Sequence, residues 1–319
     1  MNDSDRLVHI ALALDEVSQR SVAKRLESAG FALRFLSTAG ELAAVLPECR
    51  FLLVGRPPRL DWTPAVQLRL LQIAGTGVDP LFPATGLAER IWIANCRGFQ
   101  ADAVRDHALA LLLALARDLP GYLRSQSRSA WSPFPSPSLR GKKMVVVGFG
   151  DIGTRVAEAA RSFGLRVHAV RRRREIPTGV ERVASLAELE DVLGGADFAV
   201  ICLPCTRLTR GAVGGTALAA LPPRAVLVDV SRGGVVDHAA VERALREGRL
   251  AGAALDVFED EPLASGSTLW SCPGLVVTPH VGGFTPDYIE RVLDVFVDNL
   301  ALVQRGLPPS TLVSREHEY

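Results

Sequence analysis

A glycine pattern in the second half of the sequence constrains the fold more than any other feature. The apolar residues 144–147 are followed at once by Gly-Phe-Gly-Asp-Ile-Gly at 148–153, and residues 152–163 then show the spacing of an amphipathic helix. A strand, a glycine turn and a helix in this order form a nucleotide-binding crossover, although an ordinary glycine-rich turn remains the alternative. The pattern predicts a dinucleotide site formed by Gly148, Gly150, Asp151, Ile152 and Gly153.

Short apolar runs alternate with amphipathic stretches on both sides of this motif, which predicts an α/β fold with parallel sheets. The runs read as strands are 7–14, 31–36, 51–54, 70–74, 91–94, 144–147, 166–170, 198–203, 225–230, 252–255 and 275–277. The stretches read as helices include 17–29, 41–46, 101–119, 152–163 and 285–304. A segment rich in Ser, Pro and Arg, residues 125–138, interrupts the pattern and is predicted to be a loop or arm. A length of 319 residues favours two domains.

Charge, hydropathy and cysteine usage limit the classes of function. The net charge is +1, which gives no case for a nucleic acid or an anionic membrane as partner. The longest apolar run, residues 108–116, is far shorter than the roughly 20 residues that span a bilayer, and the first residues lack the pattern of a secretory leader. Five scattered cysteines fit a reducing compartment. We therefore expect a cytoplasmic protein that contacts neither membrane nor nucleic acid.

The pair Cys202 and Cys205 forms a C-x-x-C, for which two interpretations stand. The pair either performs redox or metal chemistry or consists of chance neighbours at the end of a buried strand. Neither a second cysteine pair nor a histidine cluster completes a zinc site, so no metal is predicted.

The residues after the next strand bear on the choice of dinucleotide. Sites for NAD usually place Asp or Glu about 20 residues beyond the glycines, where the carboxylate binds the ribose 2′-hydroxyl. This sequence has four arginines at 171–174 instead. Guanidinium groups bind a 2′-phosphate, so we expect Arg171 and Arg172 to favour NADP(H), with NAD(H) still possible. A solvated basic turn, with Glu175 or a backbone group serving the ribose, is the alternative.

Three further segments follow predicted strands, at the edge where open α/β sheets bind ligands. They read Ser-Arg-Gly-Gly-Val-Val-Asp at 231–237, Asp-Val-Phe-Glu-Asp-Glu-Pro at 256–262 and Thr-Pro-His-Val-Gly-Gly at 278–283. Taken singly, an arginine, a glutamate or a histidine in such loops is more often structural than catalytic. Together, and in this order after the glycine motif, the segments resemble those of the D-isomer-specific 2-hydroxyacid dehydrogenases over residues 7–307.

The resemblance implies reduction of a 2-keto acid by hydride transfer from a nicotinamide, with Arg232, Glu261 and His280 as catalytic residues. The arginine would hold the substrate carboxylate and polarise its carbonyl, because a planar fork of donors suits both tasks. His280 would donate the proton, and Glu261 would stabilise its imidazolium form.

The family pattern also implies further contacts. Thr76, Gly77 and Val78 would direct backbone N–H groups at the substrate, unless they form a plain turn. Cofactor contacts carried over from the family are Leu203, Pro204, Thr209, Val230, Ser231, Asp256 and Gly282. One departure from the family is Asp229, which stands where many relatives have Asn.

Family members combine a Rossmann-type dinucleotide-binding domain with a discontinuous, flavodoxin-like substrate domain. The implied boundaries are 1–100 and 285–319 for the substrate domain and 101–284 for the dinucleotide domain. The arm suggests a homodimer, and glyoxylate or hydroxypyruvate is the leading substrate by analogy. A cofactor-sensing binding protein, similar to the C-terminal-binding corepressors, is the alternative on the same fold.

Overall fold

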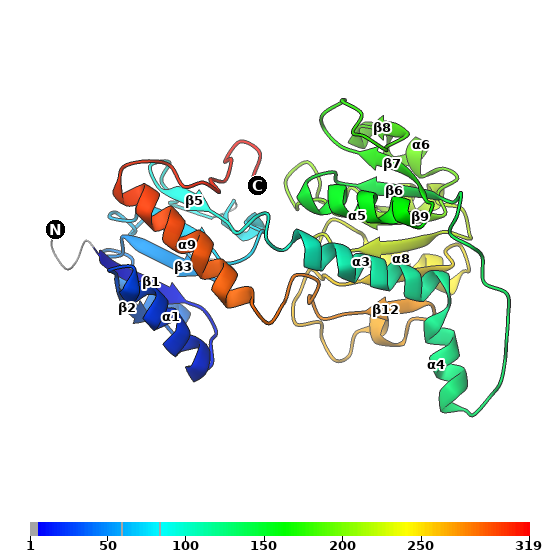
Figure 1. The fold of residues 1–319 in the computed structure, drawn as a ribbon, viewed down its shortest axis with the longest axis horizontal. Coiled ribbons are helices and arrows are strands. Elements are labelled where there is room, and N and C mark those ends of the chain that lie inside the picture. The colour runs from blue at the N-terminus through cyan, green and yellow to red at the C-terminus, as the bar shows by residue number, and fades with distance from the viewer. Residues whose placement is uncertain (1–5, 59, 83) are drawn as a thin grey trace. The chain divides into compact units, whose positions relative to one another are not determined.

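The computed structural model describes residues 6–58, 60–82 and 84–319, which divide into two compact units (Figure 1). Unit 1 consists of the residues up to Phe99 together with Thr285–Tyr319, and unit 2 consists of Gln100–Phe284. Each unit has a parallel sheet and an apolar core on both faces of that sheet. The chain therefore leaves the first unit near residue 100 and returns to it near residue 285.

Unit 1 contains a five-stranded sheet in the order β2-β1-β3-β4-β5, which is the order of flavodoxin-like folds. The strands are β1 (Leu7–Ala11), β2 (Ala32–Phe35), β3 (Phe51–Val54), β4 (Leu70–Ile73) and β5 (Trp92–Ala94). Every residue of β3 and β4 is buried because helices cover both faces, and Gln72 is the one polar residue among them. The α1 (Glu16–Ser28) and α9 (Tyr288–Gln304) helices pack on one face, and α2 (Ala39–Val45) packs on the other.

Unit 2 contains a seven-stranded parallel sheet in the order β12-β11-β10-β9-β6-β7-β8. Its strands are β6 (Lys143–Val147), β7 (Arg166–Val170), β8 (Arg182–Ala184), β9 (Phe198–Ile201), β10 (Val226–Asp229), β11 (Gly252–Leu255) and β12 (Leu275–Val277). Its helices are α3 (Ala101–Ala116), α4 (Leu119–Ser127), α5 (Asp151–Ser162), α6 (Leu189–Leu193), α7 (Gly215–Ala220) and α8 (His238–Arg246). The chain order reverses between β6 and β9, and ligands bind at such switch points. The predicted α/β class with Rossmann-type and flavodoxin-like sheets is confirmed.

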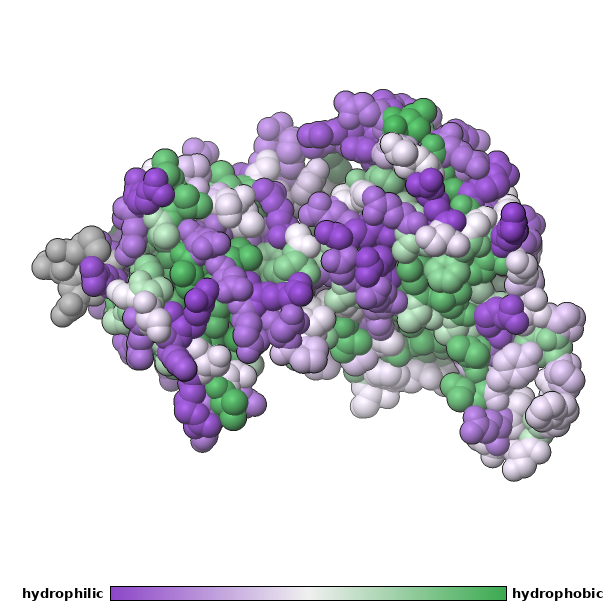
Figure 2. Space-filling view, in the orientation of Figure 1, coloured by the Kyte–Doolittle hydropathy of each residue, from purple (hydrophilic) through white to green (hydrophobic). Residues whose placement is uncertain are grey.

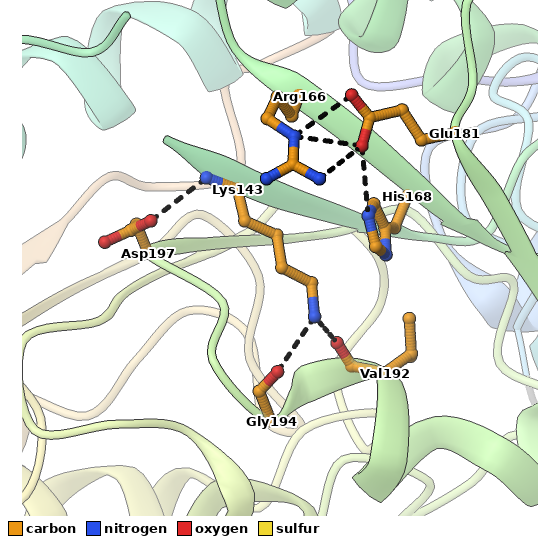
Figure 3. Close-up of polar contacts among 7 residues, drawn as sticks. All are labelled: Lys143, Arg166, His168, Glu181, Val192, Gly194 and Asp197. Atoms are coloured by element: carbon orange, nitrogen blue, oxygen red, sulfur yellow. Dashed lines mark hydrogen bonds and ion pairs between the residues drawn. The ribbon is translucent and has the colours of Figure 1, made fainter. Parts of the chain in front are cut away.

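Charged side chains at the amino edge of the unit 2 sheet pair with one another (Figure 3). Arg166 on β7 donates to both carboxylate oxygens of Glu181, and His168 Nε2 lies 3.6 Å from the same carboxylate. Lys143 Nζ donates to the backbone carbonyls of residues 192 and 194, and its backbone N–H donates to Asp197. These contacts join the first residues of neighbouring strands to the end of α6.

The segment after α3 differs from the prediction. Sequence periodicity predicted one helix over 101–119 and a loop from 125, but α3 ends at Ala116 and α4 begins at Leu119. Asp118 adopts a left-handed conformation, with φ of 46°, and its side chain accepts from the backbone N–H of Gly121. This cap starts a new helix, which places residues 119–127 in α4 and leaves a shorter arm. The β8 strand was also missed, because three residues at a sheet edge carry too short a pattern.

No helix in the described part of the chain combines the length and apolar character needed to cross a membrane. The first five residues, on which the predicted lack of a leader partly rests, lie outside the described ranges.

Candidate active site

The predicted dinucleotide and catalytic residues of unit 2 follow the carboxyl ends of its strands. Because all these strands run parallel, their carboxyl ends share one edge, and the strand order sets the order of the loops along it. Along this edge lie His280 after β12, Asp256 and Glu261 after β11, Val230, Ser231 and Arg232 after β10, Leu203, Pro204 and Thr209 after β9, Gly148, Gly150, Asp151, Ile152 and Gly153 after β6, and Arg171 and Arg172 after β7.

His280 and Glu261 are in direct contact. The imidazole Nδ1 lies 2.9 Å from Glu261 Oε2 and 3.0 Å from Oε1, and a carboxylate can only accept, so Nδ1 carries the hydrogen. The backbone N–H of Phe258 donates to the same carboxylate at 2.9 Å, which fixes its position. The His280 side chain is 42% exposed, so Nε2 is the ring nitrogen available to a reactant.

The backbone at His280 is held in a conformation that most residues avoid. Its φ is 54°, in the left-handed region, where a side chain costs about 1 kcal/mol or more. Asp256 stabilises this turn: its Oδ1 accepts from the N–H of Val281 and its Oδ2 from the N–H of Gly282, each at 3.0 Å. The residue directly after the histidine is thus anchored to a buried carboxylate.

Two residues to which the sequence gave no role complete this anchor. Thr278 Oγ1 donates to Asp256 Oδ1 at 2.6 Å, and His107 Nε2 on α3 lies 3.0 Å from Thr278 Oγ1 and 3.2 Å from Asp256 Oδ1. Burial alone raises the pKa of Asp256, but the hydrogen bonds from His107, Thr278 and the two backbone N–H groups outweigh it and lower that pKa. Asp256 is therefore an ionised acceptor. His107 stands directly before the apolar run 108–116 of α3, and that position was the only signal available in the sequence.

Arg232 follows a turn that is fixed by the end of β10. Its Nη1 donates to the backbone carbonyl of Ser231 at 2.6 Å. Ser231 itself donates through both its backbone N–H and its hydroxyl to Asp229 Oδ1. The turn before the arginine is thus tied to a buried aspartate at the end of the strand, and the guanidinium is only half-buried.

The glycine motif has the geometry that a pyrophosphate requires. A Cβ on Gly153 would lie 2.0 Å from the carbonyl oxygen of Gly148, so only glycine permits this close approach of helix and turn. The corresponding position at Gly150 has no atom within 4 Å, which leaves open space beside the backbone. The α5 helix begins at Asp151, and the free backbone N–H groups of its first turn attract an anion. These residues fit a dinucleotide.

The arginines after β7 are not equivalent. The guanidinium of Arg171 lies 5.8 Å from the ring centroid of Phe149, the residue between the first two glycines, and so borders the glycine turn. Arg174 pairs instead with Glu188 at 2.8 Å. Arg171 is thus the guanidinium that the structure places beside the predicted phosphate site.

Several of the family-derived cofactor residues are engaged by their own loops. Thr209 Oγ1 donates to the carbonyl of Pro204 and accepts from the N–H of Thr206. The Val230 side chain is buried in the core on one face of the sheet, and Leu203 packs against the core on the other face. These residues could contact a cofactor through their backbone groups, and that contact stays a prediction.

The predicted substrate loop lies in unit 1, after β4. The Asn95 side chain donates to the carbonyl of Thr76 at 2.9 Å, and the Val78 side chain is buried. The loop is therefore well held, and Gly77 lies between these two fixed residues. Its role toward a substrate stays a prediction.

The C-x-x-C pair lies in the loop that follows β9. Cys202 and Cys205 are not bonded to one another, and burial raises the pKa of the Cys202 thiol. Among residues 6–58, 60–82 and 84–319, no three His, Cys, Asp or Glu side chains are grouped so as to hold a metal ion.

Residues 109–282 match the model of the D-isomer specific 2-hydroxyacid dehydrogenase family, NAD binding domain. The glyoxylate reductase of Pyrococcus furiosus is 36% identical over 261 residues, which cover 79% of this chain and 77% of that protein. The glycerate dehydrogenase of Methylorubrum extorquens is 29% identical over 255 residues, covering 77% and 79% of the two chains.

Solved structures resemble the whole chain. A D-isomer specific 2-hydroxyacid dehydrogenase from Xanthobacter autotrophicus, in complex with NADPH and MES, has a TM-score of 0.86 and 28% identity, covering 98% of this chain and 99% of that one. An NADPH-dependent glyoxylate/hydroxypyruvate reductase from Sinorhizobium meliloti, in complex with NADP and sulfate, has a TM-score of 0.85 and 25% identity, covering 98% and 99%.

Proposed function

This chain belongs to the D-isomer-specific 2-hydroxyacid dehydrogenase family, and from that premise we propose that it is a glyoxylate or hydroxypyruvate reductase that favours NADPH. Membership makes it an NAD(P)-dependent oxidoreductase acting on small 2-keto and 2-hydroxy acids. The observation that carries the proposal is the His280–Glu261 pair, at 2.9 Å, on the sheet edge that also bears Arg232 and the glycine turn.

His280 would be the proton donor. A nicotinamide bound along the edge supplies the hydride to the carbonyl carbon of the substrate. The alkoxide that develops on the carbonyl oxygen needs a proton, and His280 Nε2 can give it because Nδ1 is committed to Glu261. The glutamate stabilises the imidazolium before the transfer, and in the reverse direction the neutral histidine would accept the proton from the hydroxy acid.

Arg232 would bind the substrate carboxylate and polarise the carbonyl. Its planar group presents parallel donors that match a carboxylate, and the developing negative charge strengthens the same contacts. The hydrogen bond from Nη1 to Ser231 orients the guanidinium before substrate arrives. Thr76, Gly77 and Val78 of unit 1 would bind the substrate through their backbone N–H groups, which suit an anion.

We assign the dinucleotide to unit 2 and the substrate-binding surface to unit 1. The glycine turn, Val230, Ser231, Gly282 and the loop from Leu203 to Thr209 would surround the cofactor. Asp256 would contact the nicotinamide carboxamide in addition to anchoring the histidine loop.

Preference for NADPH would come from Arg171, with Arg172 as a second contact. The Arg171 guanidinium borders the glycine turn, where it can pair with a 2′-phosphate that a carboxylate would repel. The variant Arg171→Asp should lose a charge-assisted contact, which lowers kcat/KM with NADPH roughly tenfold or more and raises the relative use of NADH. Arg174→Asp is the matched control, because Arg174 pairs with Glu188. A variant Arg171→Asp that still prefers NADPH would place the selectivity elsewhere.

We also propose a homodimer formed through the arm. Hydrophobic surface gathers around the end of α3 and along α4 (Figure 2). Leu123 and Trp131 are 64% and 96% exposed, which is unusual for such large apolar side chains on a monomer. The variant Leu123→Glu should convert a dimer into monomers in light scattering after size exclusion, and an unchanged mass would contradict the proposal.

The decisive test is a panel of 2-keto acids assayed with NADPH and with NADH. We expect the largest kcat/KM for glyoxylate or hydroxypyruvate with NADPH. The alternative, a cofactor-sensing binding protein, predicts tight cofactor binding without turnover of any keto acid. We further propose that the protein is cytoplasmic and binds neither a membrane nor a nucleic acid. Cell fractionation would test its location.

A further inference from the structure

Two buried polar atoms beneath the catalytic loops have no hydrogen-bond partner. Asp229, at the end of β10, is fully buried, and its Oδ2 accepts no hydrogen bond, although Oδ1 accepts two from Ser231. His238, the first residue of α8, has a buried Nε2 that is likewise unpartnered. The two atoms face each other at 3.7 Å.

The chemistry of these two groups is complementary. A buried carboxylate oxygen without a donor is costly, and so is a buried imidazole nitrogen without a partner. An imidazole N–H donates and a carboxylate accepts, and a shift of about 1 Å would bring the atoms to hydrogen-bond distance. Burial, and then the charge of Asp229, raise the pKa of the Cys202 thiol, so this neighbouring group stays neutral and does not balance the carboxylate charge.

We propose that Asp229 and His238 form a hydrogen-bonded pair that positions the catalytic residues Arg232 and Glu261. On one side, Asp229 Oδ1 holds Ser231, whose carbonyl receives the hydrogen bond from Arg232. Neither member of the pair touches a reactant, so both are positioning residues. The inference rests on the function proposed above, because it concerns how that site is held.

The His238 side of the pair is connected to Glu261 through Phe258. The His238 ring contacts the Phe258 ring at a centroid distance of 5.5 Å and an interplanar angle of 66°. The backbone N–H of Phe258 donates to Glu261, and Glu261 holds His280. The two loops also touch directly, since a Cβ on Gly233 would lie 2.0 Å from the Phe258 carbonyl oxygen. Movement of His238 would therefore disturb both loops.

A hydrogen bond between the two residues predicts that their substitutions have coupled effects, which packing alone would not produce. His238→Phe keeps the aromatic contact with Phe258 but leaves the Asp229 carboxylate buried without a donor. That carboxylate would turn away from Ser231 or take up a proton, and the turn before Arg232 would loosen. Asp229→Asn removes the charge and keeps an acceptor for Ser231. The damage from His238→Phe should therefore depend on whether residue 229 is charged.

The experiment is a double-mutant cycle of Asp229→Asn and His238→Phe, assayed with NADPH and the best keto acid. We expect His238→Phe to lower kcat/KM for the keto acid roughly tenfold or more, mainly through KM, with a smaller change in the KM for NADPH. Asp229→Asn should cost less, and the double variant should recover to the level of Asp229→Asn. The conservative variant His238→Gln, whose amide still donates, should retain more activity than His238→Phe.

A matched control is His168→Phe, because His168 is 13% exposed like His238 but lies at the opposite edge of the sheet. It should leave both KM values unchanged. Strictly additive effects in the cycle, or equal damage from His238→Gln and His238→Phe, would overturn the pair. If His238→Phe fails to fold, His238→Leu, which also lacks a donor, takes its place in the same cycle. Failure of the proposed function is distinguishable, since the unsubstituted enzyme would then reduce no keto acid.

Discussion

The two edges of the unit 2 sheet carry the same kinds of side chain but use them differently. At the amino edge, Lys143, Arg166, Glu181 and Asp197 neutralise one another or bind carbonyls that end a helix (Figure 3). At the carboxyl edge, Asp256 instead accepts hydrogen bonds from backbone N–H groups next to His280, whose backbone conformation is strained. The comparison teaches that residue type alone does not mark a functional site. The functional site is marked by a charged side chain that holds a loop in an unfavourable backbone conformation.

This difference leads to a general expectation. Substitutions at the carboxyl edge should change rate and leave the melting temperature nearly unchanged, because the strain there is relieved when the loop relaxes. Substitutions at the amino edge should change stability and leave kcat unchanged. The predictions below test this division, from the largest expected effect to the smallest.

His280→Ala should give the largest effect. Loss of a general acid typically costs at least about 10²-fold in rate. Alanine keeps a Cβ at the same left-handed position, so we expect kcat to fall by that factor or more with the melting temperature nearly unchanged. Steady-state kinetics and thermal unfolding measured on one preparation would check both. A kcat close to that of the unsubstituted enzyme would remove His280 from the mechanism.

Arg232→Lys should give the next largest effect. A lysine keeps the charge but offers a single point donor, so it cannot match a carboxylate with two parallel hydrogen bonds. Loss of one charge-assisted hydrogen bond corresponds to about 1.5–3 kcal/mol, or roughly 10- to 150-fold in kcat/KM. The KM for the keto acid should rise, whereas the Kd for NADPH, measured by fluorescence, should change little. Identical kinetics for the two residues would contradict the proposed clamp.

Asp197→Ala tests the opposite edge. The Asp197 carboxylate is 13% exposed and accepts from the backbone N–H of Lys143, from Lys142 and from Arg224. Removing it leaves donors unsatisfied at a cost of about 1–3 kcal/mol, and about 2–4 °C of melting temperature for each kcal/mol. The kcat should not change. A loss of rate without a loss of stability would break the division between the edges.

The same variant should show a defined pH dependence. Burial raises the pKa of Asp197, but hydrogen bonds from Lys143, Arg224 and Lys142 outweigh it, so the pKa lies below the ordinary value of 3.8. The stabilisation is therefore present at pH values above about 4 and is lost as the pH falls further. The difference in melting temperature between Asp197→Ala and the unsubstituted enzyme should thus be constant near neutral pH.

The sequence predicted the carboxyl edge better than the amino edge. The glycine turn, Arg232, Glu261 and His280 stand in local motifs whose spacing is set by the chain itself. The strand pattern then places them on one edge, because apolar runs between helices form parallel sheets. Motif spacing and one rule of topology predicted where these residues lie, whereas their catalytic roles came from the resemblance to the family.

The features that sequence reasoning missed depend on side-chain and strand contacts that the pattern of apolar residues does not record. His107 meets Asp256 across 149 positions, and the break at Asp118 depends on a side-chain cap that periodicity does not reveal. The pairing of His238 with Asp229 needs the end of one strand and the start of a helix in register. The three-residue strand β8 depends on β7 for its hydrogen bonds. Pattern analysis records none of these distances.

The smallest effect should come from His168→Gln at the amino edge. Burial, and then the charge of Lys143, lower the pKa of His168 below its ordinary value of 6.5, although Glu181 opposes the shift. The folded protein therefore favours the neutral ring, and stability falls as the pH drops below about 6.5, where the unfolded chain takes up the proton. Glutamine cannot titrate, so the variant should lose less melting temperature between pH 7 and pH 5.5 than the unsubstituted enzyme. The difference should stay below about 1 kcal/mol, or roughly 2–4 °C, and kcat measured at pH 7 should be the same for both proteins. A larger loss for the variant on acidification would mean that His168 is protonated in the fold and pairs with Glu181, and the amino edge would then depend on pH through an ion pair instead of through burial.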